Sequence, residues 1–175
     1  MKKIIANILR IILVFIGTGA QASAQDFKAE QYVQSASIEL KGNIEQLFPL
    51  FTPLGEKKWA EGWDPNLIFP SSGEMQEGLI FQTPDHVHGA PPLTWVVSRY
   101  NVSDHQVQYI VSSAVRVAII SVACTASGKD STNARISYVL TGLSAEGNAL
   151  SHHLIGKIFA SNLKDWETAI NNYLK

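Results

Sequence analysis

The residues with the most obvious capacity for chemistry are two histidines spaced two residues apart, His86 and His88, directly after Asp85. In an extended segment such positions share one side, and imidazole and carboxylate groups are common ligands of transition metals. His105 or His152 could supply a further ligand. Because the spacing fixes no third ligand, we favour a polar loop at a pocket mouth over a metal site, and we predict no cofactor.

Acid–base chemistry is a second possibility, since a histidine near neutral pH can both take up and release a proton. The candidates are His152 and His88, with a tyrosine as partner, although no spacing brings such a pair within hydrogen-bond reach. The sequence contains no nucleophile elbow, phosphate-binding loop or dinucleotide fingerprint. The only cysteine, Cys124, lies in an apolar run and is predicted to be a buried side chain. Whether the protein is an enzyme therefore stays open.

Large aromatic side chains form a second group that could bind a molecule, because they combine apolar area with a polar edge. The predicted ligand-binding set contains Trp59, Trp63, Trp95, Tyr100, Tyr109 and Tyr138. Trp59 and Trp63 flank Gly62 and could instead clamp small helices to a sheet. A shift of one residue in register would exchange Trp95 for Val96 on the inner face.

The element that must position further candidates is a long amphipathic helix, predicted over residues 144–175. At about 100° per residue its apolar stripe contains Ile155, Phe159, Leu163, Trp166, Ile170 and Tyr173. His152 falls near Phe159 on this stripe and Asn162 falls near Trp166, so we expect all three of His152, Phe159 and Asn162 to face a ligand. The alternative places His152 at an exposed first turn and bonds Asn162 to a neighbouring carbonyl.

The residues before this helix predict an antiparallel sheet, because short joints without helices cannot connect parallel strands. The seven expected strands cover residues 31–40, 66–70, 79–83, 93–101, 106–112, 115–125 and 134–141. One short helix is expected after Asn43 as its N-cap, and a second over 54–59. The predicted fold class is α+β: a helix-grip fold, in which a seven-stranded curved sheet wraps on the C-terminal helix, with two short helices after the first strand.

The first 24 residues have the pattern of a cleaved signal peptide: a basic start, an apolar core and a small-residue site at 22–24. We therefore expect a single mature domain over 25–175, periplasmic or secreted by a bacterium, with no stable membrane anchor after cleavage. Cleavage lowers Lys+Arg from 14 to 11 against 15 Asp+Glu, so the net charge moves from −1 to −4. No basic cluster remains, which argues against nucleic acid as a partner. A monomer and a homodimer are both compatible with the sequence.

Several segments resemble the SRPBCC superfamily, which includes START-like domains, the birch-pollen allergen group and polyketide cyclase/dehydrase-like proteins. The segments are LFTPLGEKKW (50–59), GWDP (62–65), WVVSRY (95–100), YVLTGLS (138–144), EGN (146–148), WE (166–167) and YL (173–174). The resemblance covers residues 32–174. It implies a deep cavity between sheet and last helix, which relatives use for lipids, sterols, polyketides and other apolar molecules.

Three hypotheses follow. The first is non-covalent binding or transport of a small hydrophobic or amphipathic ligand in that cavity. The second is a polyketide cyclase- or dehydratase-type enzyme that uses a pocket histidine as acid and base. The third is a structural or partner-binding domain whose cavity has collapsed.

Overall fold

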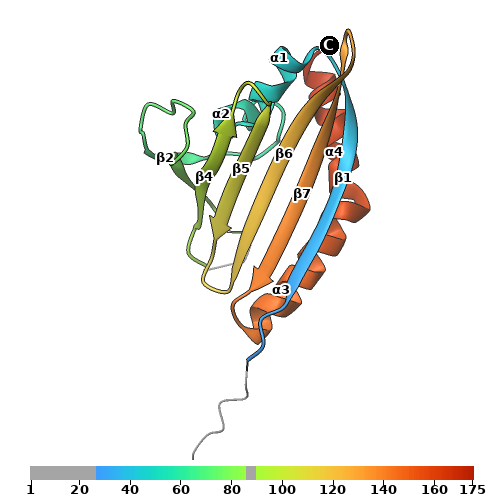
Figure 1. Ribbon diagram of the computed structural model, residues 1–175. Coiled ribbons are helices and arrows are strands. Elements are labelled where there is room, and N and C mark those ends of the chain that lie inside the picture. Colours follow the sequence, from blue (N-terminus) through green and yellow to red (C-terminus); the bar gives the residue numbers. More distant parts are fainter. Residues whose placement is uncertain (1–26, 86–89) are drawn as a thin grey trace, which may run out of the picture.

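The computed structural model describes residues 27–85 and 90–175, apart from the side chain of Asn162. Its centre is one curved antiparallel sheet of seven strands in the order β1-β7-β6-β5-β4-β3-β2 (Figure 1). The strands are β1 (Gln31–Lys41), β2 (Asn66–Phe69), β3 (Ile80–Thr83), β4 (Leu93–Asn101), β5 (Gln106–Ser112), β6 (Arg116–Gly128) and β7 (Ser131–Gly142). Strands β2 to β7 are neighbours in chain order, as their short joints predicted, and β1 closes the order beside β7.

The register of β4 decides which of its aromatic side chains face inward. Trp95 pairs with Phe81 of β3 and stacks on its ring, so Trp95 rather than Val96 lies on the inner face. The pairing of β4 with β5 then shifts between Val97 and Arg99. A bulge of this kind adds one residue and reverses the alternation of faces. Tyr100 consequently also points inward, where it stacks on Phe48.

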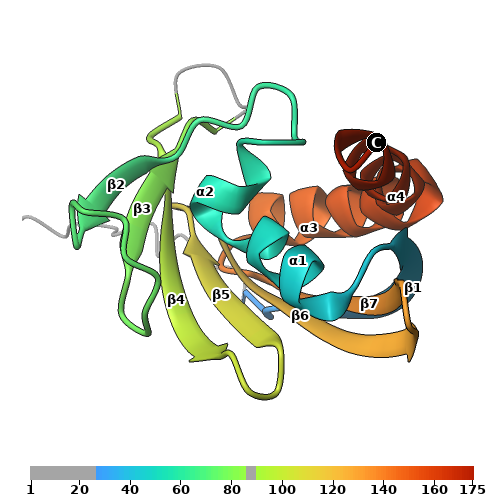
Figure 2. The same ribbon diagram turned by 90° about the horizontal axis from the view of Figure 1, so that it is seen from above.

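Three short helical pieces follow β1: α1 (Ile44–Leu47), the 3₁₀ turn η1 (Phe48–Phe51) and α2 (Pro53–Glu56). Asn43 caps α1 as predicted, accepting a hydrogen bond from the Gln46 amide at 3.0 Å. The second helix is shorter than expected, because it ends at Glu56 instead of residue 59. Figure 2 shows that α1 and α2 lie on the same side of the sheet as the C-terminal helices.

The C-terminal helix is continuous but not regular. It consists of α3 (Ala145–Lys157), a π-helical turn η2 (Ile158–Asn162) and α4 (Leu163–Tyr173). A π turn carries one extra residue, so the buried stripe shifts across it. The side chains that the stripe buries are Ser151, Ile155, Ile158, Leu163 and Ile170. Within residues 27–85 and 90–175, no helix has the length and apolar character needed to cross a membrane.

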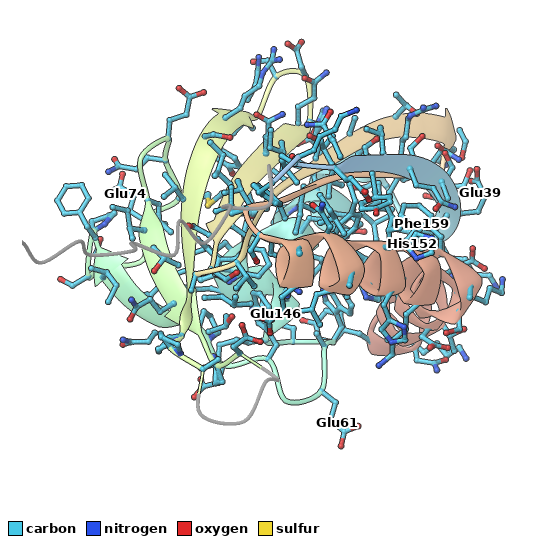
Figure 3. The ribbon with its side chains drawn as sticks, turned by 90° about the horizontal axis from the view of Figure 1, so that it is seen from below. Glu39, Glu61, Glu74, Glu146, His152 and Phe159 are labelled. Carbon is cyan, nitrogen blue, oxygen red and sulfur yellow. The ribbon has the colours of Figure 1, made fainter. Side chains whose placement is uncertain are left out.

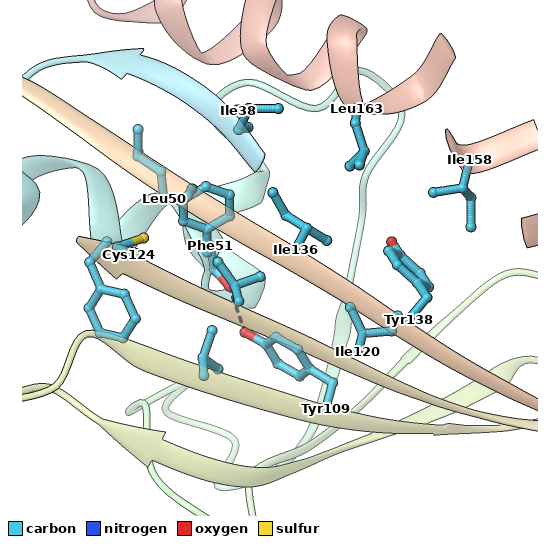
Figure 4. Close-up of a cluster of buried hydrophobic side chains, with 14 of the residues drawn as sticks. Ile38, Leu50, Phe51, Tyr109, Ile120, Cys124, Ile136, Tyr138, Ile158 and Leu163 are labelled. Carbon is cyan, nitrogen blue, oxygen red and sulfur yellow. Dashed lines mark hydrogen bonds between the residues drawn. The ribbon is translucent and has the colours of Figure 1, made fainter. Parts of the chain in front are cut away.

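The core lies between the concave face of the sheet and these helices, and most of it is closely packed (Figure 4). Its largest fully buried side chains include Leu40, Leu47, Phe48, Phe51, Ile136 and Leu140. Cys124 is buried in the same cluster, and burial raises the pKa of its thiol to about 12. The thiol is therefore protonated at neutral pH, in agreement with the prediction of a buried, unreactive side chain.

Candidate ligand-binding pocket

The α2 helix positions the carboxyl group of Glu56, the only one among the described residues that lines the aromatic pocket described below. Thr52 caps α2 through a 3.1 Å hydrogen bond from the Gly55 amide, and Pro53 occupies its first turn. Gly55 packs so tightly on the preceding turn that a Cβ atom there would lie 2.0 Å from the Pro49 carbonyl oxygen. Only glycine allows this approach. The cap, the proline and the glycine together direct the next residue, Glu56, toward the sheet.

Two tryptophans in the turn after α2 are fixed by hydrogen bonds to the same helical segment. The Trp59 indole donates to the Leu50 carbonyl at 2.8 Å, and the Trp63 indole donates to the Pro53 carbonyl at 2.9 Å. The clamping role that the sequence left open for Trp59 and Trp63 is therefore present. Both rings also line a pocket, so the two interpretations are compatible.

The floor of this pocket is a row of side chains across three strands. Tyr109 of β5 pairs with Ile120 of β6, which pairs with Tyr138 of β7. The Tyr109 hydroxyl donates to the Phe51 carbonyl at 2.7 Å, drawn as a dashed line in Figure 4. Within the described part of the chain, the Tyr138 hydroxyl has no such partner. The row therefore contains one hydroxyl tied to the backbone and one that is free.

The pocket has a volume of about 200 Å³. Its lining comprises Glu56, Trp59, Ala60, Trp63, Trp95, Tyr109, Ile120, Val122, Tyr138 and Trp166. Trp166 of α4 forms the helix side and meets Trp59 edge to face, with ring centres 5.5 Å apart. The chain contains four tryptophans, and all four line this single pocket.

A wider groove of about 600 Å³ lies elsewhere, between the end of β1 and the C-terminus. Its lining includes Lys41, Lys58, Asp130 and Leu174, most of which are exposed. Specific small-molecule sites are usually concave and largely apolar, with few fixed polar groups. The aromatic pocket fits that description and the groove does not, so we take the aromatic pocket as the candidate site.

The electrostatics of the pocket are dominated by Glu56. Burial raises the pKa of the Glu56 carboxyl to about 8, and no hydrogen bond or cation counteracts the shift. Burial also raises the pKa of Tyr138 and that of Tyr109, and the proximity of Glu56 adds to both shifts. All three groups are therefore predominantly protonated at neutral pH, and the pocket carries little charge.

Most of the aromatic residues predicted from the sequence meet in this pocket: Trp59, Trp63, Trp95, Tyr109 and Tyr138 do so. Tyr100 does not line it, because its ring stacks on Phe48 with centres 5.7 Å apart. Phe159, which was expected to face a ligand, does not line the pocket either; it is half-buried and packs edge to face on Tyr138. The side chain of Asn162 lies outside the described part of the structure.

His152 does not have the expected inward position. It is exposed, and its ring lies 5.3 Å from that of Tyr32 on β1 (Figure 3). The π turn explains the difference. In a regular α-helix, three turns before Leu163 bring the buried stripe to His152. The π turn adds one residue to this stretch, so Ser151 occupies the buried position instead. Ser151 is completely buried, and no described residue bonds to its hydroxyl.

The remaining histidine predictions concern the loop after β3. His86 and His88 lie outside the described residues, so a metal or acid–base role at these positions stays a prediction. The Nε2 atom of His105, the suggested further ligand, lies 3.0 Å from a carboxylate oxygen of Glu45 in the first turn of α1. Among the described residues, no group of three or more potential ligands gathers around one point.

Sequence reasoning missed Glu56 and did not count Trp166 as a site residue. A signal was present, because Glu56 lies three residues before Trp59 and helical residues at that spacing share a face. The acidic residue stood beside two lysines, Lys57 and Lys58, and such a charged run is more often a solvated surface. Ile120 and Val122 could not be selected because every strand offers similar apolar positions.

No protein-family model and no curated protein matches the chain. Solved structures do match it in fold. Norcoclaurine synthase from Thalictrum flavum, in complex with dopamine and hydroxybenzaldehyde, aligns with a TM-score of 0.62 and 14% identity over 95% of this chain and 96% of that chain. An uncharacterized Rhizobium leguminosarum protein aligns with a TM-score of 0.57 and 15% identity, over 83% of this chain and 97% of that chain. A conserved Geobacillus kaustophilus protein aligns with a TM-score of 0.56 and 14% identity, over 81% of this chain and 93% of that chain. The protein therefore shares the fold of these structures, and this is the helix-grip fold that the sequence predicted.

Proposed function

We propose that the protein binds a small apolar or amphipathic molecule non-covalently in the aromatic pocket, and that it does so in the periplasm or outside the cell. One observation carries the binding proposal: all four tryptophans surround a space that the rest of the core does not fill. Partly exposed indole rings around a cavity forgo contacts that a packed core would make. Such an arrangement is typical of a site whose missing contacts come from a ligand.

The volume limits the size of that molecule. About 200 Å³ corresponds to roughly seven waters at about 30 Å³ each. The pocket thus accepts a ligand of around seven to ten non-hydrogen atoms, unless side chains move. Norcoclaurine synthase, which has the same fold, was solved with two small aromatic molecules, and this supports a ligand of comparable size.

A titration of intrinsic tryptophan fluorescence with benzyl alcohol, a small amphipathic probe, tests the proposal. We expect saturable quenching in the native protein and a loss of at least tenfold in affinity after Ala60→Leu, which fills the pocket. Ala149→Leu, at an exposed helical position, is the matched control and should bind normally. Equal binding by both variants would mean that the probe binds outside the pocket and would contradict the proposal. No saturable binding at all would favour a structural domain with a collapsed cavity.

Acid–base catalysis is a second candidate, and Glu56 favours it. A carboxyl with a pKa near 8, next to the Tyr138 hydroxyl, can donate a proton at neutral pH and accept one above it. In this version Glu56 replaces His152 as the pocket acid. Once a reaction is identified, Glu56→Gln should lower kcat by at least a hundredfold with little change in KM. An unchanged kcat removes this candidate.

A further inference from the structure

The polar groups of the pocket differ in whether they already have hydrogen-bond partners in the protein. Three of the four indole N–H groups already donate to protein acceptors: those of Trp59, Trp63 and Trp95, the last to Thr83 Oγ1 at 3.0 Å. The Tyr109 hydroxyl is also engaged. The Glu56 carboxyl, in contrast, has no hydrogen-bond or ion-pair partner among the described residues. What the pocket lacks is a positive group.

The indole rings that line the pocket meet one another at steep angles. Trp63 and Trp95 meet at 88° with centres 5.4 Å apart, and Trp59 and Trp166 meet at 64°. In an edge-to-face pair, the ring that points its edge at its partner keeps both of its own faces uncovered by that partner. The face of an indole carries negative electrostatic potential and attracts a cation placed within about 6 Å of it.

The lining also excludes the opposite charge. Of the described residues around the pocket, none is lysine, arginine or histidine. Lys57 is paired with Asp64 at 2.7 Å on the exposed side of the turn, and Lys58 is exposed. An anion would meet indole faces and a carboxyl group without any cation to balance it.

We propose that the ligand of this pocket is a small organic cation, a protonated amine or a quaternary ammonium, held between the Glu56 carboxylate and the tryptophan faces. The inference rests on the proposed function and specifies its ligand class. It combines three independent features: the unpartnered carboxyl, the indole rings and the lack of basic lining residues.

Binding of a fixed cation has a defined proton balance. Without ligand, Glu56 is mostly protonated at neutral pH, so the carboxyl must release its proton to the solvent when the cation binds. The titratable groups that face Glu56 are Tyr109 of β5 and Tyr138 of β7, and both stay protonated in the range concerned. The rings that approach from the turn and from α4, Trp59 and Trp166, do not titrate.

Choline and its neutral isostere 3,3-dimethyl-1-butanol are a matched pair of probes for this idea. Each has seven non-hydrogen atoms and the same shape, and the charge of choline does not change with pH. Isothermal titration near pH 9 should show that choline binds at least tenfold more tightly than the alcohol. Near pH 6.5 choline should bind about thirtyfold more weakly than near pH 9, because Glu56 is then protonated. Titrations near pH 7 in buffers of different ionisation enthalpy should reveal close to one proton released for each choline bound.

Two variants assign the effect to the carboxyl. Glu56→Gln should reduce choline affinity at least tenfold near pH 9 and leave the affinity for the alcohol within about twofold. Glu61→Gln, at an exposed position of the same turn, should change neither (Figure 3). If the alcohol binds as tightly as choline in the native protein, the pocket is a ligand site but not a cation site. If neither probe binds, both the cation inference and the binding function lose their support.

Discussion

Two parts of the same interior differ in how completely they are packed. Under α1 and η1 the space between helix and sheet is filled by side chains such as Phe48, Phe51 and Ile136, each at most 2% exposed. Next to α2 the sheet carries the same kind of surface, but the rings above it are only half-buried and surround a pocket of about 200 Å³. Among the residues that the structure describes, no carboxyl group is buried in the packed part, whereas the Glu56 carboxyl lines the pocket and has no partner there.

This contrast separates residues that stabilise the fold from residues that reduce its stability. A filled core contributes dispersion contacts and apolar burial. A buried carboxyl without a partner does the opposite, because it must lose its charge or remain poorly solvated. Sites that are retained at a cost in stability are commonly functional sites. The difference between the two parts can be tested by mutation.

The largest expected effect is on the packed side. Phe51→Ala should lower the free energy of unfolding by about 3–5 kcal/mol, because it opens a cavity in a region with no space to relax. Urea denaturation followed by circular dichroism measures this change. On the pocket side, Trp166→Phe should cost less than about 1.5 kcal/mol, since the ring is half-buried and already borders the cavity. Equal losses would remove the distinction between the two parts.

The next effect has the opposite sign and depends on pH. The pKa of Glu56 is about 8 in the folded protein, against an ordinary value of 4.5, so the folded state binds more protons between these pH values. Stability of the native protein should therefore fall as pH rises through that window. Glu56→Gln removes the cost of ionising this carboxyl in the folded state. Relative to the native protein, its free energy of unfolding should be unchanged near pH 4.5 and higher by about 1–3 kcal/mol above pH 8. This gain is smaller than the full pKa shift would give, because the Glu56 side chain is not completely buried and keeps some contact with solvent.

The comparison for that variant is Glu61→Gln, which changes an exposed glutamate five residues along the chain. Thermal unfolding at intervals from pH 4.5 to pH 9 should show the same profile for this control and for the native protein. A Glu56→Gln profile that also runs parallel to the native one would mean that the Glu56 carboxyl is ordinary.

A finer test uses the two tyrosines at either end of the pocket floor. Tyr109→Phe removes the buried 2.7 Å hydrogen bond to the Phe51 carbonyl, so it should cost about 1–2 kcal/mol. Tyr138→Phe removes a hydroxyl that has no partner among the described residues, so stability should change by less than about 0.5 kcal/mol. Chemical denaturation of both variants side by side measures the difference. The reverse order would show that Tyr138 has the partner and Tyr109 has none.

The smallest effect is expected at His152. Because its ring lies on the outer surface beside Tyr32, His152→Ala should change stability by less than about 0.5 kcal/mol and leave ligand binding unaltered. Fluorescence titration with benzyl alcohol provides the check. A tenfold loss of affinity would show that His152 belongs to the ligand-binding site and would contradict this prediction.

The sequence was sufficient for the architecture, because strand alternation, turn residues and the apolar stripe of the last helix are strong periodic signals. It also identified the aromatic side chains, of which five meet in the pocket: Trp59, Trp63, Trp95, Tyr109 and Tyr138. Prediction from the sequence failed where a single inserted residue rotates the buried stripe of a helix. The π turn at 158–162 moved His152 out of the stripe, and no local residue pattern announces such a turn. Glu56 was missed because only tertiary packing distinguishes it from the lysines that follow it.

The central claim is that Glu56 is a carboxyl kept neutral in an aromatic pocket. Carbon-detected NMR of the side-chain carboxyl carbon of Glu56, followed from pH 4 to pH 10, measures its pKa directly. The structure predicts a midpoint near 8, displaced from the other glutamates. A midpoint near 4.5 would show an ordinary solvated carboxylate and contradict the account.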